Sequence, residues 1–317
     1  MSCVPFGGIT GWGHEMRIIV VGLGIQGLKR ERAAGSDFVA AVDPYMREAE
    51  YTRIGDIPLS EYDAAMVCVP YEPKAGIIHW CLEHDKHVLV EKPLWVGNEA
   101  QLGQLEALAN ERGLVCYTAY NHRFEPSIER MRALIASGDL GSIYSCRMFY
   151  GNGTARLVRD SWRDEYGALW EIGPHLLDLA REWFGERDLR DFRVVSARAY
   201  ENVRADHVVV GVRGVPRIEL EMTFLSWRNT FTIDVIGANG SAHVDGLMKW
   251  GVSRFTKRQR VLPSGVPPEE SIVLTGADST WAHEYGHFKH LCDTRVHCDL
   301  SNDLWMHRVL NRLEDYM

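Results

Sequence analysis

The chain has 317 residues, of which 46% are hydrophobic and 25% are charged, with a formal net charge of −8 at pH 7 and a pI near 5.9. This composition is typical of a globular protein with room for two domains. The acidic balance argues against nucleic acid or an anionic membrane as the main partner, and no apolar run approaches the length of a membrane span.

The beginning of the chain and its cysteines bear on where the protein works. Residues 1–15 lack both a basic segment and a long apolar core, so they predict a mobile extension rather than a signal peptide. The seven cysteines are scattered and form no CxxC pair. This usage favours reduced thiols and a cytoplasmic protein.

An apolar run breaks into glycines at the spacing GxGxxG over residues 22–27. In a dinucleotide-binding turn, Gly22 makes the tight bend, Gly24 lets the backbone approach a pyrophosphate, and Gly27 lets a helix pack on the preceding strand. The helix expected over 25–34 then offers free N–H groups to the phosphates. We therefore expect cofactor contacts from Gly22, Gly24, Ile25, Gln26 and Gly27.

A second buried strand, expected over 38–42, ends in Asp43 about 20 residues after the first glycine. An acidic side chain there accepts hydrogen bonds from the adenine-ribose hydroxyls and repels a 2′-phosphate. Asp43 thus favours NAD over NADP, although NADP remains possible. The alternative is a glycine turn in an unrelated α/β protein, with Asp43 as a solvated residue.

Strands and helices then alternate along the chain, with strands at 63–70, 87–90 and 114–117 and helices at 73–83 and 99–111. This alternation predicts a doubly wound parallel α/β sheet of the Rossmann type over residues 16–120. The segment 44–62 is short for a helix with its connections, so the crossover there is expected to be abbreviated.

The rhythm changes after Tyr120. Helices are expected at 127–137, 174–184, 281–293 and 301–316, and strands at 143–150, 194–200, 207–213, 217–225, 231–236 and 241–244, with a loop at 262–270. Residues 217–224 alternate polar and apolar, and Asn239-Gly240 is a strong hairpin signal. We predict a C-terminal α+β domain, 121–317, with a large, mainly antiparallel sheet.

Lys92 follows the strand at 87–90 and precedes Pro93, which favours an extended backbone. At the carboxyl end of a parallel strand, a lysine can hydrogen-bond a substrate hydroxyl and stabilise the alkoxide that forms as hydride leaves. The alternative is a surface lysine at a strand end.

A second group of reactive side chains surrounds His175. Pro174 suits the first turn of a helix, so His175 is expected near a helix N-terminus, where the positive dipole end disfavours imidazolium. A neutral imidazole there can accept a proton, and Glu171 can orient it. Alternatively, His175 and Asp178 only cap and solvate the start of a helix.

His283-Glu284-Tyr285-Gly286-His287 matches the HExxH zinc motif. Gly286 weakens the helix that the motif requires, and no third ligand is evident. We therefore expect no metal site, and interpret these histidines as solvated or interface residues.

The motifs taken together resemble the Gfo/Idh/MocA (glucose–fructose oxidoreductase / inositol dehydrogenase / MocA) family. They are the glycine turn, Asp43, Glu91-Lys92-Pro93, Tyr120-Asn121-His122-Arg123-Phe124 and the run Gly167-Ala168-Leu169-Trp170-Glu171-Ile172-Gly173-Pro174-His175. The resemblance extends from Met16 over nearly the whole chain. It implies a Rossmann domain followed by an open antiparallel sheet that builds homodimers or homotetramers.

The resemblance also implies a function. Family members oxidise a ring hydroxyl of a sugar, sugar nucleotide or cyclitol with a nicotinamide cofactor, or run the reverse reaction. By position, Lys92 polarises the hydroxyl, His175 is the general acid/base and Glu171 assists it. Further cofactor contacts are expected from Pro70, Glu91, Lys92 and Asn121, and substrate contacts from Lys92, Arg123, Arg163 and His175.

Two positions depart from the family pattern. Glu171 stands where aspartate is more common, which moves its carboxylate outward, and Lys74 stands where many members have histidine. Two other functions stay open: a glycoside hydrolase of the same family that keeps NAD bound, and a non-catalytic dinucleotide-sensing protein.

Overall fold

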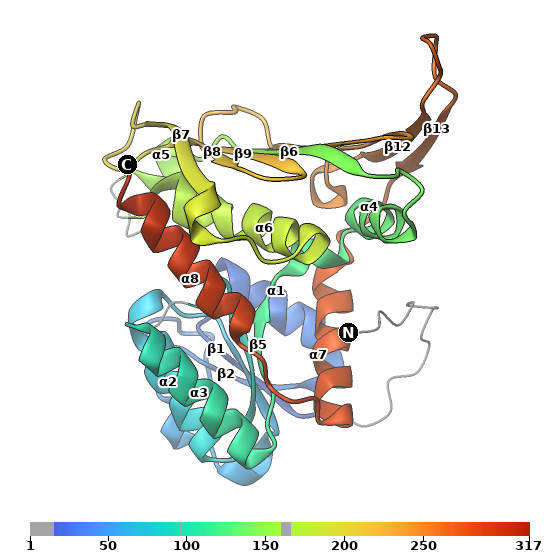
Figure 1. Cartoon of the computed structure of the whole chain (residues 1–317). Coiled ribbons are helices and arrows are strands. Elements are labelled where there is room, and N and C mark those ends of the chain that lie inside the picture. The colour runs from blue at the N-terminus through green and yellow to red at the C-terminus, as the bar shows by residue number, and fades with distance from the viewer. Residues whose placement is uncertain (1–15, 95–96, 160–165) are drawn as a thin grey trace. The chain divides into compact units, whose positions relative to one another are not determined.

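The computed structural model describes residues 16–94, 97–159 and 166–317, and these form two compact units (Figure 1). The first unit contains residues 16–119 and 281–301. The second contains residues 120–280 and 302–317. Residues 1–15, predicted as an extension, lie outside the described residues.

The first unit is built on a five-stranded parallel sheet with the order β2-β1-β3-β4-β5. Its strands are β1 (Ile18–Val21), β2 (Phe38–Val42), β3 (Ala64–Val67), β4 (His87–Glu91) and β5 (Cys116–Ala119). The chain passes from β1 to β2 on one side and then to β3 on the other, which makes β1 the switch point where such sheets bind ligands. The predicted parallel sheet is confirmed.

Helices cover both faces of this sheet. They are α1 (Ile25–Ala34), α2 (Tyr71–Glu83), α3 (Glu99–Arg112) and α7 (Thr280–Thr294). Figure 1 shows α2 and α3 packed side by side. Between β2 and β3 the chain makes only two short 3₁₀ turns, η2 (Ile54–Asp56) and η3 (Leu59–Glu61), so the abbreviated crossover is confirmed.

Residues 281–301, most of which form α7, belong to the first unit rather than to a continuous second domain over 121–317. Tyr285, Phe288 and Cys292 enter the same apolar core as Ile18 and Val20 of β1. Burial of these side chains against the parallel sheet is the physical reason for the placement. The sequence predicted a helix over 281–293, but not the sheet that this helix covers.

The second unit is built on an eight-stranded sheet with the order β13-β12-β11-β10-β6-β9-β8-β7. Its strands are β6 (Ile143–Gly151), β7 (Phe192–Arg198), β8 (His207–Val212), β9 (Arg217–Thr223), β10 (Thr230–Gly237), β11 (Gly240–Asp245), β12 (Ser253–Gln259) and β13 (Glu269–Leu274). All neighbours pair antiparallel except β6 and β9. The predicted mainly antiparallel sheet and the Asn239-Gly240 hairpin are confirmed.

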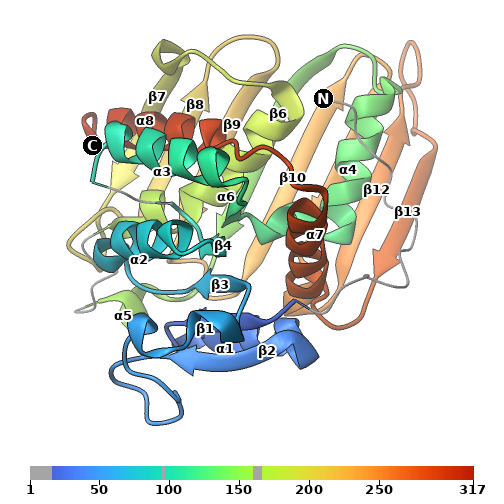
Figure 2. The same ribbon diagram turned by 90° about the horizontal axis from the view of Figure 1, so that it is seen from below.

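The helices of the second unit are α4 (Pro126–Ser137), α5 (Ala155–Val158), α6 (Gly167–Phe184) and α8 (Ser301–Glu314). Figure 2 shows α4 and α6 lying against the sheet, where α6 contacts β9 and α4 contacts β11 and β12. Alternate residues of β9 follow this arrangement: Ile218 and Leu220 are buried, whereas Glu219 and Glu221 are partly exposed. No described helix is long and apolar enough to cross a membrane.

Candidate functional site

The glycine turn sits at the carboxyl end of β1. Gly22 has φ +93°, and a Cβ there would lie 2.8 Å from the carbonyl oxygen of Cys68. A Cβ on Gly27 would lie 1.9 Å from the carbonyl oxygen of Gly22, so α1 can pack on the turn only with glycine. Gly24 is the N-cap of α1, and apart from its own atoms and its two chain neighbours no described atom lies within 4 Å of its Cβ position.

These observations fit a pyrophosphate. The first turn of α1 carries no acidic side chain and receives no side-chain cap, so its N–H groups can meet an anion. Ile25, the first helical residue, is 76% exposed, and Gln26 follows it on the same exposed turn. The residues assigned to the dinucleotide are therefore assembled on one strand-to-helix turn.

Asp43 is tied to the same turn. Its Oδ2 accepts the backbone N–H of Leu23 at 2.8 Å, and its Oδ1 accepts those of Tyr45 at 2.8 Å and Met46 at 3.1 Å. Partial burial acts to raise the pKa of Asp43, but these three hydrogen bonds outweigh it and lower the pKa. The carboxylate is thus ionised and fixed beside the glycines.

The Glu91-Lys92-Pro93 turn ends β4 and is held by two buried cations. Arg30 Nε donates to Glu91 Oε1 at 2.7 Å, and Arg30 Nη2 forms an ion pair with the same oxygen at 2.7 Å. Lys74 donates from Nζ to the carbonyl oxygens of Glu91 at 2.5 Å and Pro93 at 2.9 Å, and the Lys92–Pro93 peptide is cis. Lys92 therefore lies between two carbonyl groups that the same ammonium fixes in place.

Glu91 and Lys74 thus hold the turn in this structure. The Glu91 carboxylate, assigned to cofactor binding, is engaged by Arg30. Lys74, noted above only as a departure from the family pattern, is 2% exposed and supports the turn. Pro70, also assigned to the cofactor, is the exposed N-cap residue of α2 after β3.

The glutamate of the HExxH motif takes part in a buried ion pair. Glu284 is fully buried on α7 and pairs with Arg30 Nη2 at 2.7 Å. The Trp281 ring covers the same guanidinium, with 4.4 Å between the guanidinium carbon and the ring centroid. The glutamate that a zinc hydrolase would use as its base is therefore half of a buried ion pair.

In the second unit, the turn η4 (Asn121–Phe124) contacts its neighbours through polar side chains. Asn121 donates from Nδ2 to Thr280 Oγ1 at 3.2 Å. Arg123 donates two hydrogen bonds to Asp178, from Nε to Oδ2 at 2.7 Å and from Nη2 to Oδ1. Arg123, which was assigned to substrate binding, is thus held against α6 by a bidentate ion pair.

One expectation about His175 was wrong. Pro174 lies inside α6 and not in its first turn, because the helix begins seven residues earlier, at Gly167. His175 therefore lies in the middle of a helix, where the dipole argument for a neutral imidazole fails. Glu171 lies one helical turn before it and is half-buried, so the proximity of these two side chains is retained.

Aromatic rings surround His175, which is 8% exposed. The His122 ring centroid is 3.9 Å away in an edge-on arrangement, and the Tyr150 ring is stacked at 5.9 Å. Lys249 Nζ lies 3.0 Å from His122 Nε2. In the sequence, His122 stands within a motif that gave it no role, and no local pattern marks Tyr150 or Lys249.

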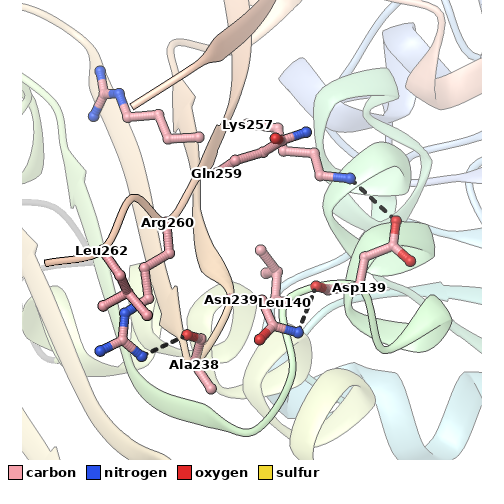
Figure 3. Close-up of a pocket in the computed structure, with 9 residues that line it drawn as sticks. Asp139, Leu140, Ala238, Asn239, Lys257, Gln259, Arg260 and Leu262 are labelled. Carbon is pink, nitrogen blue, oxygen red and sulfur yellow. Dashed lines mark hydrogen bonds and ion pairs between the residues drawn. The ribbon is translucent and has the colours of Figure 1, made fainter. Parts of the chain in front are cut away.

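A pocket of about 460 Å³ is lined by β12 and the residues that follow it, the β10–β11 turn and the loop after α4. Figure 3 shows these side chains. The pocket's cations are engaged: Lys257 Nζ lies 3.1 Å from Asp139 Oδ2, and Arg260 donates to the carbonyl oxygen of Ala238 at 3.0 Å. The described residues that line it include none assigned above to the site. Arg163, assigned to substrate, lies outside the described residues.

Comparisons with known proteins cover both units. Residues 16–120 match the model of an oxidoreductase family with an NAD-binding Rossmann fold, and residues 128–243 match that of the GFO/IDH/MocA C-terminal domain. Trans-1,2-dihydrobenzene-1,2-diol dehydrogenase of Bos taurus is 27% identical over 219 residues. That alignment covers 65% of this chain and 64% of the relative, so the chain matches just under two thirds of that protein.

Solved structures share the fold. UDP-N-acetylglucosamine 3-dehydrogenase from Acidithiobacillus ferrooxidans superposes with a TM-score of 0.80 at 19% identity, covering 95% of this chain and 97% of the other. An inositol dehydrogenase homologue from Azotobacter vinelandii, complexed with NAD⁺, gives 0.77 at 17% identity, covering 98% and 97%. At these identities the likeness is one of fold.

Proposed function

Since the chain belongs to the Gfo/Idh/MocA family of oxidoreductases, we propose that it transfers hydride between a nicotinamide cofactor and a ring hydroxyl or ketone. The substrate class is a sugar, a sugar nucleotide or a cyclitol. Similar proteins named for an inositol, a sugar nucleotide and a cyclic diol support this class. The observation that carries the proposal is the Glu91-Lys92-Pro93 turn, where Arg30 and Lys74 hold Lys92 at the carboxyl end of β4.

The cofactor preference follows from Asp43. Its pKa is lowered by the N–H groups of Leu23, Tyr45 and Met46, so a carboxylate stands where the adenine ribose is expected. A carboxylate accepts hydrogen bonds from ribose hydroxyls and repels a phosphate. We therefore propose NAD as the preferred cofactor, with NADP bound more weakly.

The proposed chemistry gives each candidate side chain its own role. When bound, the nicotinamide supplies the hydride acceptor. The Lys92 ammonium donates a hydrogen bond to the reacting hydroxyl and stabilises the developing alkoxide. His175 accepts the hydroxyl proton, and Glu171, one helical turn before it, orients the imidazole.

The test is NADH formation, followed at 340 nm, by the purified full-length chain with NAD⁺ or NADP⁺ and a panel of sugars, sugar acids, sugar nucleotides and inositols. We expect reduction with one substrate class and a preference for NAD⁺. Glycoside cleavage without net NADH would favour the hydrolase. Tight NAD⁺ binding with no turnover of any kind would favour the sensor.

We also propose that the chain forms a homodimer or homotetramer through the sheet of the second unit and works in the cytoplasm. Figure 1 shows the described helices of this unit on one face of that sheet only, and none of the six described cysteines forms a disulfide. The uncovered face carries cross-strand ion pairs such as Arg147 with Glu221, at 3.0 Å. Light scattering after size exclusion will test the assembly, and a monomer at micromolar concentration would contradict it.

A further inference from the structure

Lys249 lies in the turn η7 (Met248–Trp250), which follows β11. A hydrogen bond fixes this turn, because the backbone N–H of Met248 donates to Oε1 of the fully buried Glu125 at 2.9 Å. The side chain of Lys249 therefore projects from an anchored turn, and its contacts are a consequence of the fold.

The ammonium of Lys249 meets one imidazole and two aromatic rings. Nζ lies 3.0 Å from His122 Nε2 and 3.4 Å from the hydroxyl of Tyr150. It also lies 4.6 Å from the ring centroid of Trp250. An ammonium can only donate, so the lone pair of His122 Nε2 must accept, and the proton of a neutral His122 is on Nδ1.

His122 carries this arrangement to His175. Their ring centroids are 3.9 Å apart, and Tyr150 contacts both rings, with its centroid 5.6 Å from that of His122 and 5.9 Å from that of His175. The positive charge of Lys249 is thus one ring away from the proposed acid/base. A proton added to either imidazole would place a second positive charge beside the first.

Anionic groups oppose this effect only in part. Glu125 and Asp278 attract Lys249, but burial outweighs them and lowers its pKa to about 8, which leaves it mainly charged at neutral pH. Burial likewise raises the pKa of Glu125. On α6, Asp178 is neutralised by Arg123, and Glu171 is the remaining carboxylate within one turn of His175.

We propose that Lys249 is a positioning residue that keeps His122 and His175 neutral at physiological pH, so that His175 can accept the substrate proton. This inference rests on the proposed role of His175. It also supplies what the helix dipole does not: His175 lies in mid-helix, so the charge that disfavours imidazolium comes from a side chain on η7.

The kinetic test compares the pH dependence of kcat/KM, in the direction of alcohol oxidation, for wild type, Lys249→Met and Lys249→Arg. Removing the charge lets imidazolium form more easily, so the acid limb of Lys249→Met should move up by about one pH unit. Below both midpoints this variant loses about tenfold in kcat/KM. Arginine keeps the charge and should restore the wild-type midpoint, whereas a structural role would lower the plateau and leave the midpoint unmoved.

Lys257→Met is the matched control. This lysine belongs to the same unit but pairs with Asp139 at the sheet edge, so its removal should leave the acid limb unchanged. An acid limb that moves equally in both methionine variants would contradict the proposal.

A second readout needs no substrate. NMR titration of the wild-type chain, with His175 assigned by comparison with His175→Gln, should place its midpoint below the ordinary value of about 6.5. In Lys249→Met the midpoint should rise. A wild-type midpoint at or above 6.5 overturns the inference even if the variants fail to fold. Absence of turnover with a low midpoint would contradict only the proposed function.

Discussion

In each unit a cation lies near the candidate catalytic side chain: Arg30 near the turn that holds Lys92, and Lys249 near His175. The partners of the two cations differ. In the first unit Arg30 is fully buried between the carboxylates of Glu91 and Glu284. In the second unit Lys249 faces the imidazole of His122 and the phenol of Tyr150. A cation between two anions fixes geometry, whereas a cation among neutral rings changes which protonation state those rings prefer.

Removing each cation should therefore affect a different property of the protein. Removing Arg30 leaves two buried carboxylates facing each other, so the fold of the first unit should suffer. Removing Lys249 leaves neutral rings, so a titration should change more than stability.

Arg30→Met should cost about 3–5 kcal/mol of the free energy of unfolding, because it strands the charges of Glu91 and Glu284 away from water. Urea denaturation will measure the loss. Arg53→Met is the control: that guanidinium is 79% exposed and pairs with Asp56, so its loss should be within error of wild type. Equal losses for the two variants would contradict the buried-pair account.

Lys74→Met should lower kcat/KM by about tenfold or more, because the carbonyl groups on either side of Lys92 lose their shared donor. Lys86 offers a matched control, since its Nζ donates to the carbonyl oxygens of Leu59 at 2.7 Å and Tyr62 at 2.9 Å. Both variants should lose about 1–3 kcal/mol of stability. A drop in activity shared by Lys86→Met would show that stability, not the turn, is responsible.

Asp43→Asn should weaken NAD⁺ binding by about tenfold, since the amide nitrogen cannot accept the N–H of Leu23 and a ribose acceptor is lost. Binding of NADP⁺ should change less, because the repulsion of its phosphate is removed at the same time. Fluorescence titration with both cofactors gives the ratio. An unchanged ratio would mean that Asp43 does not set the preference.

Glu125→Gln should give the smallest effect, visible only as a change with pH. Burial raises the pKa of Glu125 in the folded state above its ordinary 4.5, so the folded state binds this proton more tightly than the unfolded state. Stability from this group is present below pH 4.5 and is lost as pH rises through the folded pKa. The glutamine variant, which can still accept the Met248 N–H, should gain in Tm relative to wild type between pH 4 and pH 7.

Local patterns in the sequence predicted most of the fold. The bounds of α1 and β2 were predicted from the strand–turn–helix–strand pattern around the glycines, and the Asn239-Gly240 turn from its backbone requirement. The strands β12 and β13 were missed because β12 is mostly polar, and β13 has polar residues followed by a short, mostly exposed apolar run, so neither shows an alternation to detect.

The candidate site was predictable only where one short segment holds it. The glycine turn and Glu91-Lys92-Pro93 are such segments. Pro174 was read as a helix start because proline favours that place, yet the residues before it continue α6. The cations Arg30, Lys74 and Lys249 owe their positions to long-range contacts, which no spacing in the sequence encodes.

The most direct test of the central claim is a double-mutant cycle on kcat/KM for the substrate that the panel identifies, with Lys92→Ala, His175→Ala and the double variant. If both side chains act in one reaction step, each single variant should lose about 10²–10⁴ in kcat/KM. The double variant should then lose much less than the product of the two, because the groups act as a unit. Full turnover retained by both single variants would contradict the account.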